Sequence, residues 1–362
     1  MKALILSCST GGGHNSCARY IYEELISNNI EATFSDFYDI VNTNAKEMSS
    51  KIYLSTLGGN GEVFKTVYKL GELYSKTKIK SPVYLVNKMH TKKLYNYIID
   101  NNYDIVITTH LFPSLTLTAI NKGAFPKKIK FITIATDYEP CPFIEETLPD
   151  YLIMQKDLED KFIKKGIKKE ILYPSGIPVS TKFITSAKSI RNELSITNEK
   201  VILIMLGSMG FGKITNILHD ILLLPNVKVL VVCGTNKKLY EELLLIDNPN
   251  LIPLGFVSNI NDLIYSSDIV LSKPGGLSST EIASLRKPLL HIFPIPGIET
   301  YNTTFFANRT MSLKCTTPEE IITNINKLLT DSSLCQEMIE NQEKYINASS
   351  AKDLVELIIK EF

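Results

Sequence analysis

The residues of this 362-residue chain that are best suited to chemistry lie in and after its glycine-rich turns. The first turn, Ser9-Thr10-Gly11-Gly12-Gly13, follows a short apolar run and precedes a helical pattern. Glycines at the start of a helix present backbone N–H groups and the positive end of the helix dipole to an anion. His14 comes directly after this turn, where an imidazole could act as a general base. A histidine that fixes the turn by bonding to the backbone would stand at the same position.

A second turn, Gly207-Ser208-Met209-Gly210-Phe211-Gly212-Lys213-Ile214, matches the phosphate-loop pattern G-x-x-x-x-G-K-S/T except at its last residue. That residue normally carries a hydroxyl that binds Mg²⁺, and Ile214 has none. The sequence therefore disfavours an ATPase. It favours a loop that wraps a diphosphate without a metal ion.

A third turn, Ser272-Lys273-Pro274-Gly275-Gly276, ends an apolar run and opens a helix that begins with Leu277, Ser278, Ser279 and Thr280. Backbone N–H groups at this turn could hold a diphosphate. Glu281 could accept two hydrogen bonds from a vicinal diol such as a ribose, or it could complete a capping box with Ser278. A fourth turn leads to Glu299 and Asn302, which suit either sugar hydroxyls or a helix N-terminus.

Two similar halves must position these turns, because short apolar runs alternate with amphipathic stretches along the whole chain. This alternation predicts an α/β fold with two doubly wound, parallel, Rossmann-like sheets. Strands are expected at 3–7, 31–34, 104–108, 130–135 and 151–154, and then at 201–206, 227–232, 251–254, 269–271 and 289–292. The clearest helical patterns cover 16–27, 157–165, 318–329 and 351–359. In such folds ligands bind beyond the carboxyl ends of the strands, which predicts a site in a central cleft that both domains face.

We expect a first domain over 1–180 that binds the acceptor and the membrane, and a second over 181–345 that binds a nucleotide sugar. The joint falls within 174–198, which is rich in Ser, Thr, Pro and Gly. The last helix, within 346–362, could return to the first domain.

Composition narrows the class of protein. The formal net charge is only +1, which does not suggest a nucleic-acid partner. No apolar run reaches the roughly 18 residues that a membrane span needs. Six scattered cysteines without ligand spacing predict reduced thiols in a cytoplasmic protein, and we expect no metal ion and no cofactor.

One segment is strongly basic within this nearly neutral chain. Residues 63–93 hold eight lysines and a single acid, Glu72, with aromatic and aliphatic residues interleaved. This combination suits an anionic membrane surface, although a solvated helix face over an ordinary core would look the same. Gly58-Gly59-Asn60-Gly61 would link it flexibly to the preceding chain. As contacts with the acceptor or the membrane we expect Gly12, Gly13, Phe64, Lys65, Tyr68, Lys69, Tyr74, Lys76, Lys78, Lys80 and Tyr84.

Five motifs in a fixed order carry a resemblance to a known family. They are Gly11-Gly12-Gly13-His14-Asn15-Ser16-Cys17-Ala18, Thr136-Asp137, Ser175-Gly176-Ile177-Pro178-Val179, Lys273-Pro274-Gly275-Gly276 with Glu281, and Pro296-Gly297 with Glu299 and Asn302. Over nearly its whole length the chain resembles the diacylglycerol glycosyltransferases. These are the monogalactosyldiacylglycerol synthases and the processive diacylglycerol glucosyltransferases of Gram-positive bacteria, cousins of the enzyme that adds N-acetylglucosamine to the lipid-linked peptidoglycan precursor.

The resemblance implies a GT-B fold and an inverting, metal-independent transfer of a hexose from a UDP-sugar to the hydroxyl of diacylglycerol or a glycosyl-diacylglycerol. By matching position, His14 would be the base, and Asp137 would orient it, act as the base itself or cap a turn. Glu281 would bind the ribose, and Glu299 and Asn302 would face the donor sugar. The diphosphate would lie between Gly207–Gly210 and Gly275–Ser279, and Phe256 and Val257 would meet the uracil. Such an enzyme would associate peripherally with the inner face of the cell membrane.

Two departures from the family pattern concern the substrates. Ile298 stands where relatives usually have Gln, which bears on the donor sugar or its affinity. The run Tyr138-Glu139-Pro140-Cys141-Pro142-Phe143 replaces a His and a Trp that many relatives carry after the Thr-Asp pair, which bears on the acceptor.

Four rival functions share parts of this pattern. The first is transfer of N-acetylglucosamine from its UDP form to a polyprenyl lipid, and the second is a UDP-sugar epimerase. The third is an NAD-dependent oxidoreductase, for which Asp36 could bind the ribose although Ser16 replaces the third glycine of its fingerprint. The fourth is a non-catalytic sensor of nucleotide sugars.

Overall fold

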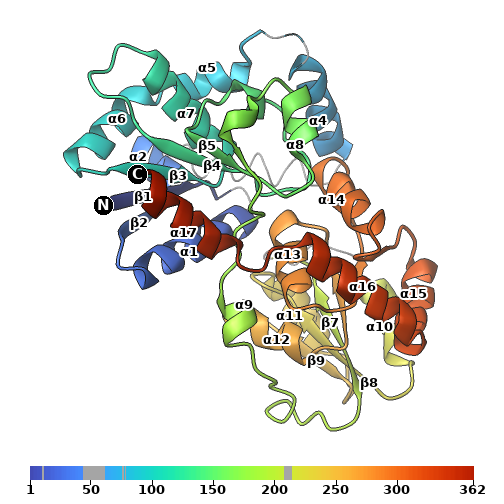
Figure 1. Cartoon of the computed structure of the whole chain (residues 1–362). Coiled ribbons are helices and arrows are strands. Elements are labelled where there is room, and N and C mark those ends of the chain that lie inside the picture. Colours follow the sequence, from blue (N-terminus) through green and yellow to red (C-terminus); the bar gives the residue numbers. More distant parts are fainter. Residues whose placement is uncertain (10–11, 44–61, 76, 78, 208–213) are drawn as a thin grey trace. The chain divides into compact units, whose positions relative to one another are not determined.

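The computed structural model of the chain describes residues 1–9, 12–43, 62–75, 77, 79–207 and 214–362. The described residues form two compact units, one of residues 1–180, 295–298 and 349–362 and the other of residues 181–294 and 299–348. Each unit contains one six-stranded sheet, whose paired strands all run parallel, with helices packed around it (Figure 1). The expected α/β fold with two Rossmann-like sheets is therefore confirmed.

The sheet of the first unit has the strand order β2-β1-β3-β4-β5-β6. Its strands are β1 (Lys2–Ser7), β2 (Glu31–Asp36), β3 (Ile105–Thr108), β4 (Phe131–Ile134), β5 (Tyr151–Ile153) and β6 (Leu172–Tyr173). Its helices are α1 (Gly12–Ser27), α2 (Phe37–Val41), α4 (Glu62–Ser75), α5 (Pro82–Lys88), α6 (Thr91–Asp100), α7 (Leu111–Lys122), α8 (Glu159–Lys164) and α17 (Ser350–Glu361), with short 3-10 turns at η2 (Ile144–Glu146) and η3 (Lys169–Ile171). The five strands expected in this half are confirmed, whereas β6 is too short to show a periodic pattern in the sequence.

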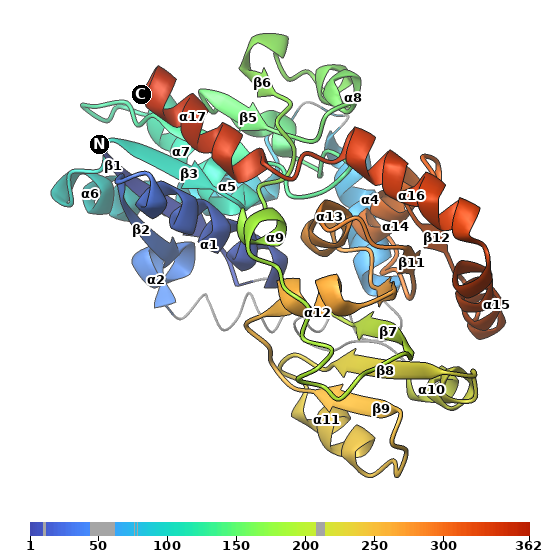
Figure 2. The same cartoon turned by 60° about the horizontal axis from the view of Figure 1, so that its bottom comes forward.

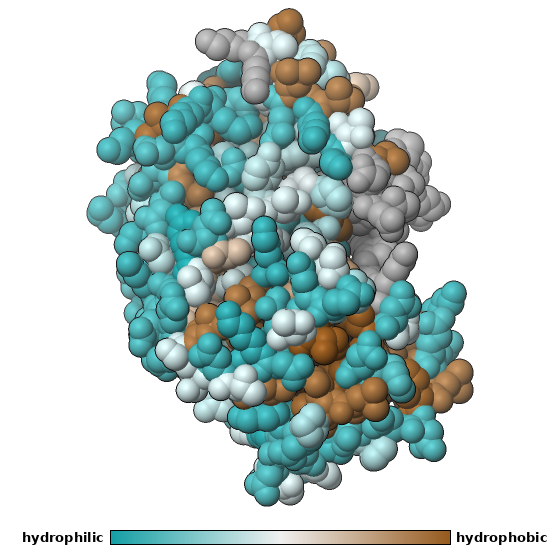
Figure 3. Space-filling model, turned by 90° about the vertical axis from the view of Figure 1, so that its right-hand side faces the viewer, coloured by the Kyte–Doolittle hydropathy of each residue, from teal (hydrophilic) through white to brown (hydrophobic). Residues whose placement is uncertain are grey.

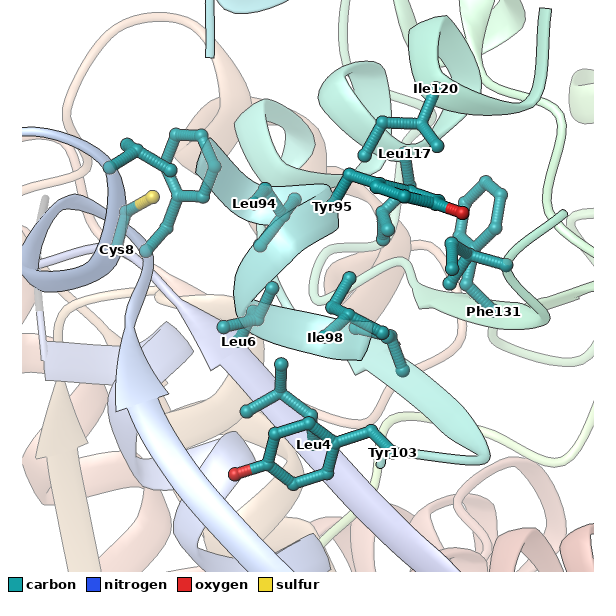
Figure 4. Packing of buried hydrophobic residues seen from close by; sticks show 14 residues of the cluster. Leu4, Leu6, Cys8, Leu94, Tyr95, Ile98, Tyr103, Leu117, Ile120 and Phe131 are labelled. Atoms are coloured by element: carbon teal, nitrogen blue, oxygen red, sulfur yellow. The ribbon is translucent and has the colours of Figure 1, made fainter. Parts of the chain in front are cut away.

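A single apolar cluster supports β1 from one side. Leu4 and Leu6 alternate along β1, so they point to the same face of the sheet. There they meet Leu94 and Ile98, which lie four residues apart and therefore share one face of α6 (Figure 4). All four side chains are buried, and burying a leucine or isoleucine side chain contributes about 1.5–3 kcal/mol to stability. This packing holds rigid the strand that leads into the first glycine turn.

Helix α17 brings the end of the chain onto the first unit. Its first residue, Ser350, is buried, donates its hydroxyl to the carbonyl of Ile177 at 2.7 Å and accepts from the backbone N–H of Val179 at 3.3 Å. The helix then packs against α1 through an apolar face that includes Leu354 and Ile358 (Figure 1). The helical pattern expected over 351–359 is confirmed.

The sheet of the second unit has the strand order β12-β11-β10-β7-β8-β9, and β7, β8 and β9 lie side by side in Figure 2. Its strands are β7 (Lys200–Met205), β8 (Val227–Val232), β9 (Leu251–Leu254), β10 (Ile269–Ser272), β11 (Leu289–His291) and β12 (Leu313–Lys314). Its helices are α9 (Lys182–Thr185), α10 (Thr215–Leu222), α11 (Lys237–Leu244), α12 (Ile260–Ser266), α13 (Gly276–Ser284), α14 (Ile298–Ala307), α15 (Pro318–Thr330) and α16 (Ser332–Tyr345). The five strands expected in this half are confirmed, and the two-residue edge strand β12 was not expected.

Candidate active site

His14 is the third residue of α1 and meets residues that follow two other strands of the first sheet. Its ring nitrogen Nδ1 lies 2.7 Å from the carbonyl oxygen of Thr109 and 3.1 Å from the hydroxyl of Thr136. Thr109 follows β3 directly and Thr136 comes shortly after β4, the next strand of the sheet. A carbonyl oxygen can only accept, so Nδ1 carries the ring proton and Nε2 carries the lone pair. The imidazole is therefore held in the tautomer that a base acting through Nε2 requires.

Burial lowers the pKa of His14 from its usual 6.5, while the negative charge of Asp137 and the hydrogen bond to Thr109 partly oppose this effect. The ring of His110 lies edge-on to it, with 4.8 Å between the ring centroids. His110 caps α7, since its Nδ1 accepts from the backbone N–H of Phe112 at 3.2 Å. Burial, and then the proximity of His14, holds the pKa of His110 well below its usual value. Both imidazoles are consequently neutral at pH 7, and His14 can take up a proton.

Asp36 ties the end of β2 to the start of the first glycine turn. One carboxylate oxygen accepts from the backbone N–H of Ser9 at 2.8 Å and from the Ser9 hydroxyl at 2.6 Å. The other accepts from the backbone N–H of Tyr38 at 2.9 Å and so caps α2. An oxidoreductase would need this carboxylate for a ribose, so its engagement in the fold argues against that rival. Of the turn itself, residues 10 and 11 lie outside the described part of the chain, Gly12 is partly buried and Gly13 is exposed.

In the second unit, the turn between β10 and α13 exposes backbone at a helix start. Gly275 is the N-cap of α13, and no side chain caps this helix. A Cβ atom at Gly275 would meet no described atom within 4 Å, and the same holds for Gly207 after the neighbouring strand β7. Gly207 also has a φ of +79°, which glycine adopts without strain. A diphosphate could thus approach the backbone at both turns, as we expected for Gly207 and Gly275–Ser279. Ser208, Met209 and Gly210 lie outside the described residues.

Helix α13 is braced by its own hydroxyl residues. Thr280 donates its hydroxyl to the carbonyl of Gly276 at 2.7 Å, and the Ser279 hydroxyl lies 2.9 Å from Nε2 of His291. Leu277 is buried in the same helix. Glu281, also buried, is the sixth residue of α13, and Ser278 is the third residue rather than the cap. The capping-box interpretation of Glu281 is therefore wrong, and its ribose-binding role stays a prediction.

His291 links α13 to the residue that precedes the neighbouring strand β12. Its Nε2 meets Ser279, and its Nδ1 lies 3.0 Å from the hydroxyl of Ser312. The ring also lies edge-on to Phe306 of α14 at a centroid distance of 5.2 Å. Complete burial lowers the pKa of His291 to about 3. This histidine is thus a neutral polar brace behind the turn.

Lys273, Glu299 and Asn302 connect the same turn to α14. The Lys273 ammonium lies 3.5 Å from a carboxylate oxygen of Glu299, the second residue of α14. Asn302 is fully buried and donates its side-chain N–H to the carbonyl of Pro274 at 2.9 Å. Neither Glu299 nor Asn302 is the N-cap of the helix. Asn302 therefore shapes the turn, and its contact with the donor sugar stays a prediction.

Phe256 and Val257, the residues predicted to meet the uracil, follow β9 at the edge of the second sheet. The Phe256 side chain is 73 % exposed and Val257 is partly buried. An exposed phenylalanine beside a strand end could stack on a base. The role of both residues stays a prediction.

Within the lysine-rich segment the structure describes α4, α5 and the start of α6. Lys69 and Lys80 are exposed, and Lys65, Tyr68 and Tyr74 are partly buried. Lys76, Lys78, residues 58–61 and the side chain of Phe64 lie outside the described part of the chain. Lys80 also lies 3.8 Å from a carboxylate oxygen of Glu146, an acid that a count over residues 63–93 does not include.

The prediction that Tyr84 contacts the acceptor or the membrane is wrong. Its side chain is only 7 % exposed and packs with Leu115 and Ala119 of α7. The physical reason is the start of α5, where the backbone N–H of Ser81 donates to Glu146 at 2.8 Å and the Ser81 hydroxyl accepts from the Tyr84 N–H at 3.0 Å. These bonds turn Tyr84 towards the core, where it adds to packing and not to a membrane-facing surface.

The sequence did not single out several of the residues that build these arrangements. Thr109, His110 and His291 carried no prediction, and Lys273 was only part of a motif. The missed signal was their position, since each of them lies at or just beyond the end of a strand. Polar residues at that place in a parallel sheet are the ones that reach a ligand site.

Comparison with known proteins identifies the family. Residues 14–179 match the family described as "Monogalactosyldiacylglycerol (MGDG) synthase", and residues 201–358 match the "Glycosyltransferase family 28 C-terminal domain". A "Processive diacylglycerol beta-glucosyltransferase" of Bacillus subtilis (strain 168) is 27 % identical over 372 residues, which span 99 % of this chain and 95 % of the relative. The chain is therefore a glycosyltransferase, whose first and second halves match these two families. The resemblance drawn from the five motifs is thereby confirmed.

Solved structures show that this glycosyltransferase has the GT-B fold class. MurG of Acinetobacter baumannii is similar with a TM-score of 0.62 at 15 % identity, covering 99 % of each chain. A UDP-GlcNAc 2-epimerase from Neisseria meningitidis bound to UDP-GlcNAc is similar with a TM-score of 0.61 at 17 % identity, covering 100 % of each chain. At such low identity both likenesses concern the fold alone, and they do not favour the epimerase or the polyprenyl-lipid alternative.

Proposed function

We propose that this glycosyltransferase transfers a hexose from a UDP-sugar to the hydroxyl of diacylglycerol, or of a glycosyl-diacylglycerol, with His14 as the general base. The single observation that carries the proposal is the tautomer of His14, whose Nδ1 donates to the carbonyl of Thr109 at 2.7 Å and leaves Nε2 as an acceptor. The lipid acceptor is supported by the full-length similarity to processive diacylglycerol beta-glucosyltransferases.

The reaction is a single displacement at the anomeric carbon. The acceptor oxygen forms a bond to that carbon, its proton passes to Nε2 of His14, and the bond to the β-phosphate oxygen breaks with its electron pair, releasing UDP. The partly buried, neutral imidazole is ready to accept the proton. As the proton arrives, the charge of Asp137 and the Thr109 carbonyl favour the imidazolium. Asp137 is thus assigned the supporting role and His14 the role of base.

The donor is assigned to the second unit. The diphosphate would lie against the uncapped start of α13 at Gly275 and Gly276 and beside Gly207, where backbone N–H groups and the helix dipole favour the negative charge of the leaving UDP. Glu281 would accept from the ribose hydroxyls, and Glu299 would accept from hydroxyls of the sugar. These groups supply the electrostatic stabilisation, so the proposal includes no metal ion and no cofactor.

Helix α4 would hold the enzyme at an anionic membrane surface. Four apolar side chains of this helix are 54–63 % exposed, namely Val63, Val67, Leu70 and Leu73. Lys65 and Lys69 lie between them in the sequence, and basic residues next to exposed apolar ones are typical of interfacial helices. Figure 3 shows hydrophobic side chains scattered among hydrophilic ones at the surface, seen from the side on which Figure 1 draws α4. Among the helices that the structure describes, none is long and apolar enough to cross a membrane.

The test is product formation with a variant that removes only the proposed base. The wild-type enzyme is incubated with labelled UDP-glucose, UDP-galactose or UDP-N-acetylglucosamine and with diacylglycerol in anionic vesicles, and labelled lipids are separated. In His14→Asn the amide N–H can still donate to Thr109 as Nδ1 does, but Nε2 is lost. We expect kcat to fall about 10²- to 10⁴-fold while UDP affinity, measured by calorimetry, is unchanged.

The matched control is His219→Ala, because His219 is an exposed histidine of α10. It should leave both turnover and UDP affinity unchanged. If the wild type binds UDP but labels no lipid with any donor, it is a sensor and the proposal fails. If His14→Asn retains full turnover, another group is the base.

A further inference from the structure

Lys273 is a buried lysine that the mechanism above does not use. It directly follows β10, an inner strand of the second sheet, and precedes the Pro274-Gly275 turn. Its backbone N–H donates to the carbonyl of Met205 at 3.2 Å, which continues the pairing of β10 with β7. Lysine is almost never buried without a partner, because removing an ammonium group from water is costly. A buried lysine at this place therefore indicates a specific structural or functional role.

The partner of Lys273 is the carboxylate that we assign to the donor sugar. The ammonium lies 3.5 Å from Glu299, and the two side chains are only 10 % and 14 % exposed. A pair this well shielded from water interacts more strongly than a surface ion pair, whose net contribution is close to zero. Removal of the lysine would leave the Glu299 carboxylate as an uncompensated, shielded charge, which is strongly unfavourable.

The turn is linked to α14 by this ion pair and also by Asn302. Asn302 lies three residues after Glu299, on the same side of α14, and its amide donates to Pro274 at 2.9 Å. The backbone carbonyl of Glu299 is itself bonded by the hydroxyl of Thr303 at 2.8 Å. The backbone at Glu299 is thus held by the helix and by Asn302, whereas Lys273 acts on the carboxylate itself.

We propose that Lys273 is a positioning residue for the donor sugar, which holds and directs the Glu299 carboxylate so that it can accept from sugar hydroxyls. The inference rests on the proposed function, since it deepens the same donor site. A carboxylate can accept about four hydrogen bonds, so an ammonium on one oxygen does not exhaust its capacity. Through Glu299, Lys273 contributes to binding of the sugar part of the donor, whereas the backbone of the turn binds the UDP part.

This division predicts that a substitution at Lys273 weakens the binding of UDP-glucose much more than the binding of UDP. Lys273→Met keeps most of the volume and removes the charge. We expect the affinity for UDP-glucose to fall about tenfold to a hundredfold, the range for loss of a hydrogen bond to a charged group, while the affinity for UDP changes less than about threefold. Lys273→Arg keeps the charge and should recover part of the loss. Glu299→Gln should weaken UDP-glucose similarly, and the double variant Lys273→Met/Glu299→Gln should be little worse than either single one.

The experiment is calorimetric titration of the full chain with UDP and with UDP-glucose, together with thermal melts of each variant. Lys238→Met is the matched control, because Lys238 pairs with Glu242 at 3.8 Å but is 87 % exposed, so its loss should change neither affinity.

Equal losses for UDP and UDP-glucose in Lys273→Met would mean that the lysine acts on the diphosphate or the turn, and would overturn the inference. Unchanged UDP-glucose affinity would overturn it as well. If Lys273→Met does not fold, Lys273→Arg and Glu299→Gln still decide, since additive losses in their combination would refute the coupling. A wild type that binds neither ligand would instead refute the proposed function.

Discussion

Acidification tests how the second unit holds His291. The imidazole is completely buried between Ser279 and Ser312, and burial lowers its pKa from 6.5 to about 3. Between these two pH values His291 is protonated in the unfolded chain but not in the folded chain. The free energy of unfolding therefore decreases as the pH falls through this window. One proton corresponds to about 1.4 kcal/mol per pH unit, and the unfolded histidine is only partly protonated near pH 6.5. Lowering the pH from 7.5 to 4.5 should therefore cost about 2–3 kcal/mol at this residue alone.

The variant His291→Gln isolates this contribution, because glutamine can still bond to a serine hydroxyl but does not titrate. At pH 7.5 the variant should be less stable than the wild type, since a hydrogen bond to one serine is lost at a cost of about 1–3 kcal/mol. On going to pH 4.5 the wild type loses about 2–3 kcal/mol of this advantage, so the two proteins should become similar in stability or exchange their order. His14 and His110, whose pKa values burial also lowers, are present in both proteins and cancel in the difference.

The measurement is urea unfolding followed by far-ultraviolet circular dichroism, since the chain has no tryptophan. The free energies of the transition that responds to the substitution are compared at pH 7.5, 6.5, 5.5 and 4.5. A stability difference between the two proteins that stays constant over this range would refute the reasoning, because His291 would then not be held neutral by the fold. A difference that grows on acidification would refute it more strongly.

Two further predictions concern the first unit. Thr136→Val removes a hydroxyl 3.1 Å from Nδ1 of His14 and keeps the side-chain shape, so kcat should fall about twofold to tenfold with an unchanged KM for UDP-glucose, as steady-state kinetics would show; a change in KM alone would contradict the assigned place of Thr136. Val67→Asp places a charge on the exposed apolar face of α4 and should reduce partition into anionic vesicles about tenfold in a sedimentation assay. Leu245→Asp, at an exposed leucine of the second unit, is its control, and equal losses in both variants would argue against α4 as the membrane-binding surface.

The strands could be predicted because buried parallel strands appear in the sequence as short, continuous apolar runs. Residues 227–232 and 251–254 were expected as strands with the bounds that the structure has. The edge strands β6 and β12 have two residues each, and so short a segment has no pattern of its own. Whether it pairs is decided by the neighbouring strand, which lies elsewhere in the sequence.

The site could be predicted only as far as local sequence determines it. A glycine turn followed by His14 indicates a histidine at a helix start, but its tautomer depends on Thr109, which lies 95 residues further along the chain. Tyr84 was misplaced for the same reason, because Glu146, 65 residues after Ser81, fixes the start of α5. Residue type and spacing thus indicate which groups can do chemistry, and long-range contacts decide which direction they face.

Buried and partly buried polar residues concentrate at the same topological place in both units. In the first, His14 meets residues that follow β3 and β4, and in the second, Lys273 follows β10 and His291 ends the adjacent strand β11. Each of these groups costs folding free energy, since an imidazole or ammonium group must leave water. An apolar residue of similar size could fill the space with less loss of stability. A fold that retains titratable groups at the carboxyl ends of its inner strands, where ligands of such sheets bind, is therefore arranged for binding and proton transfer, and not for maximal stability.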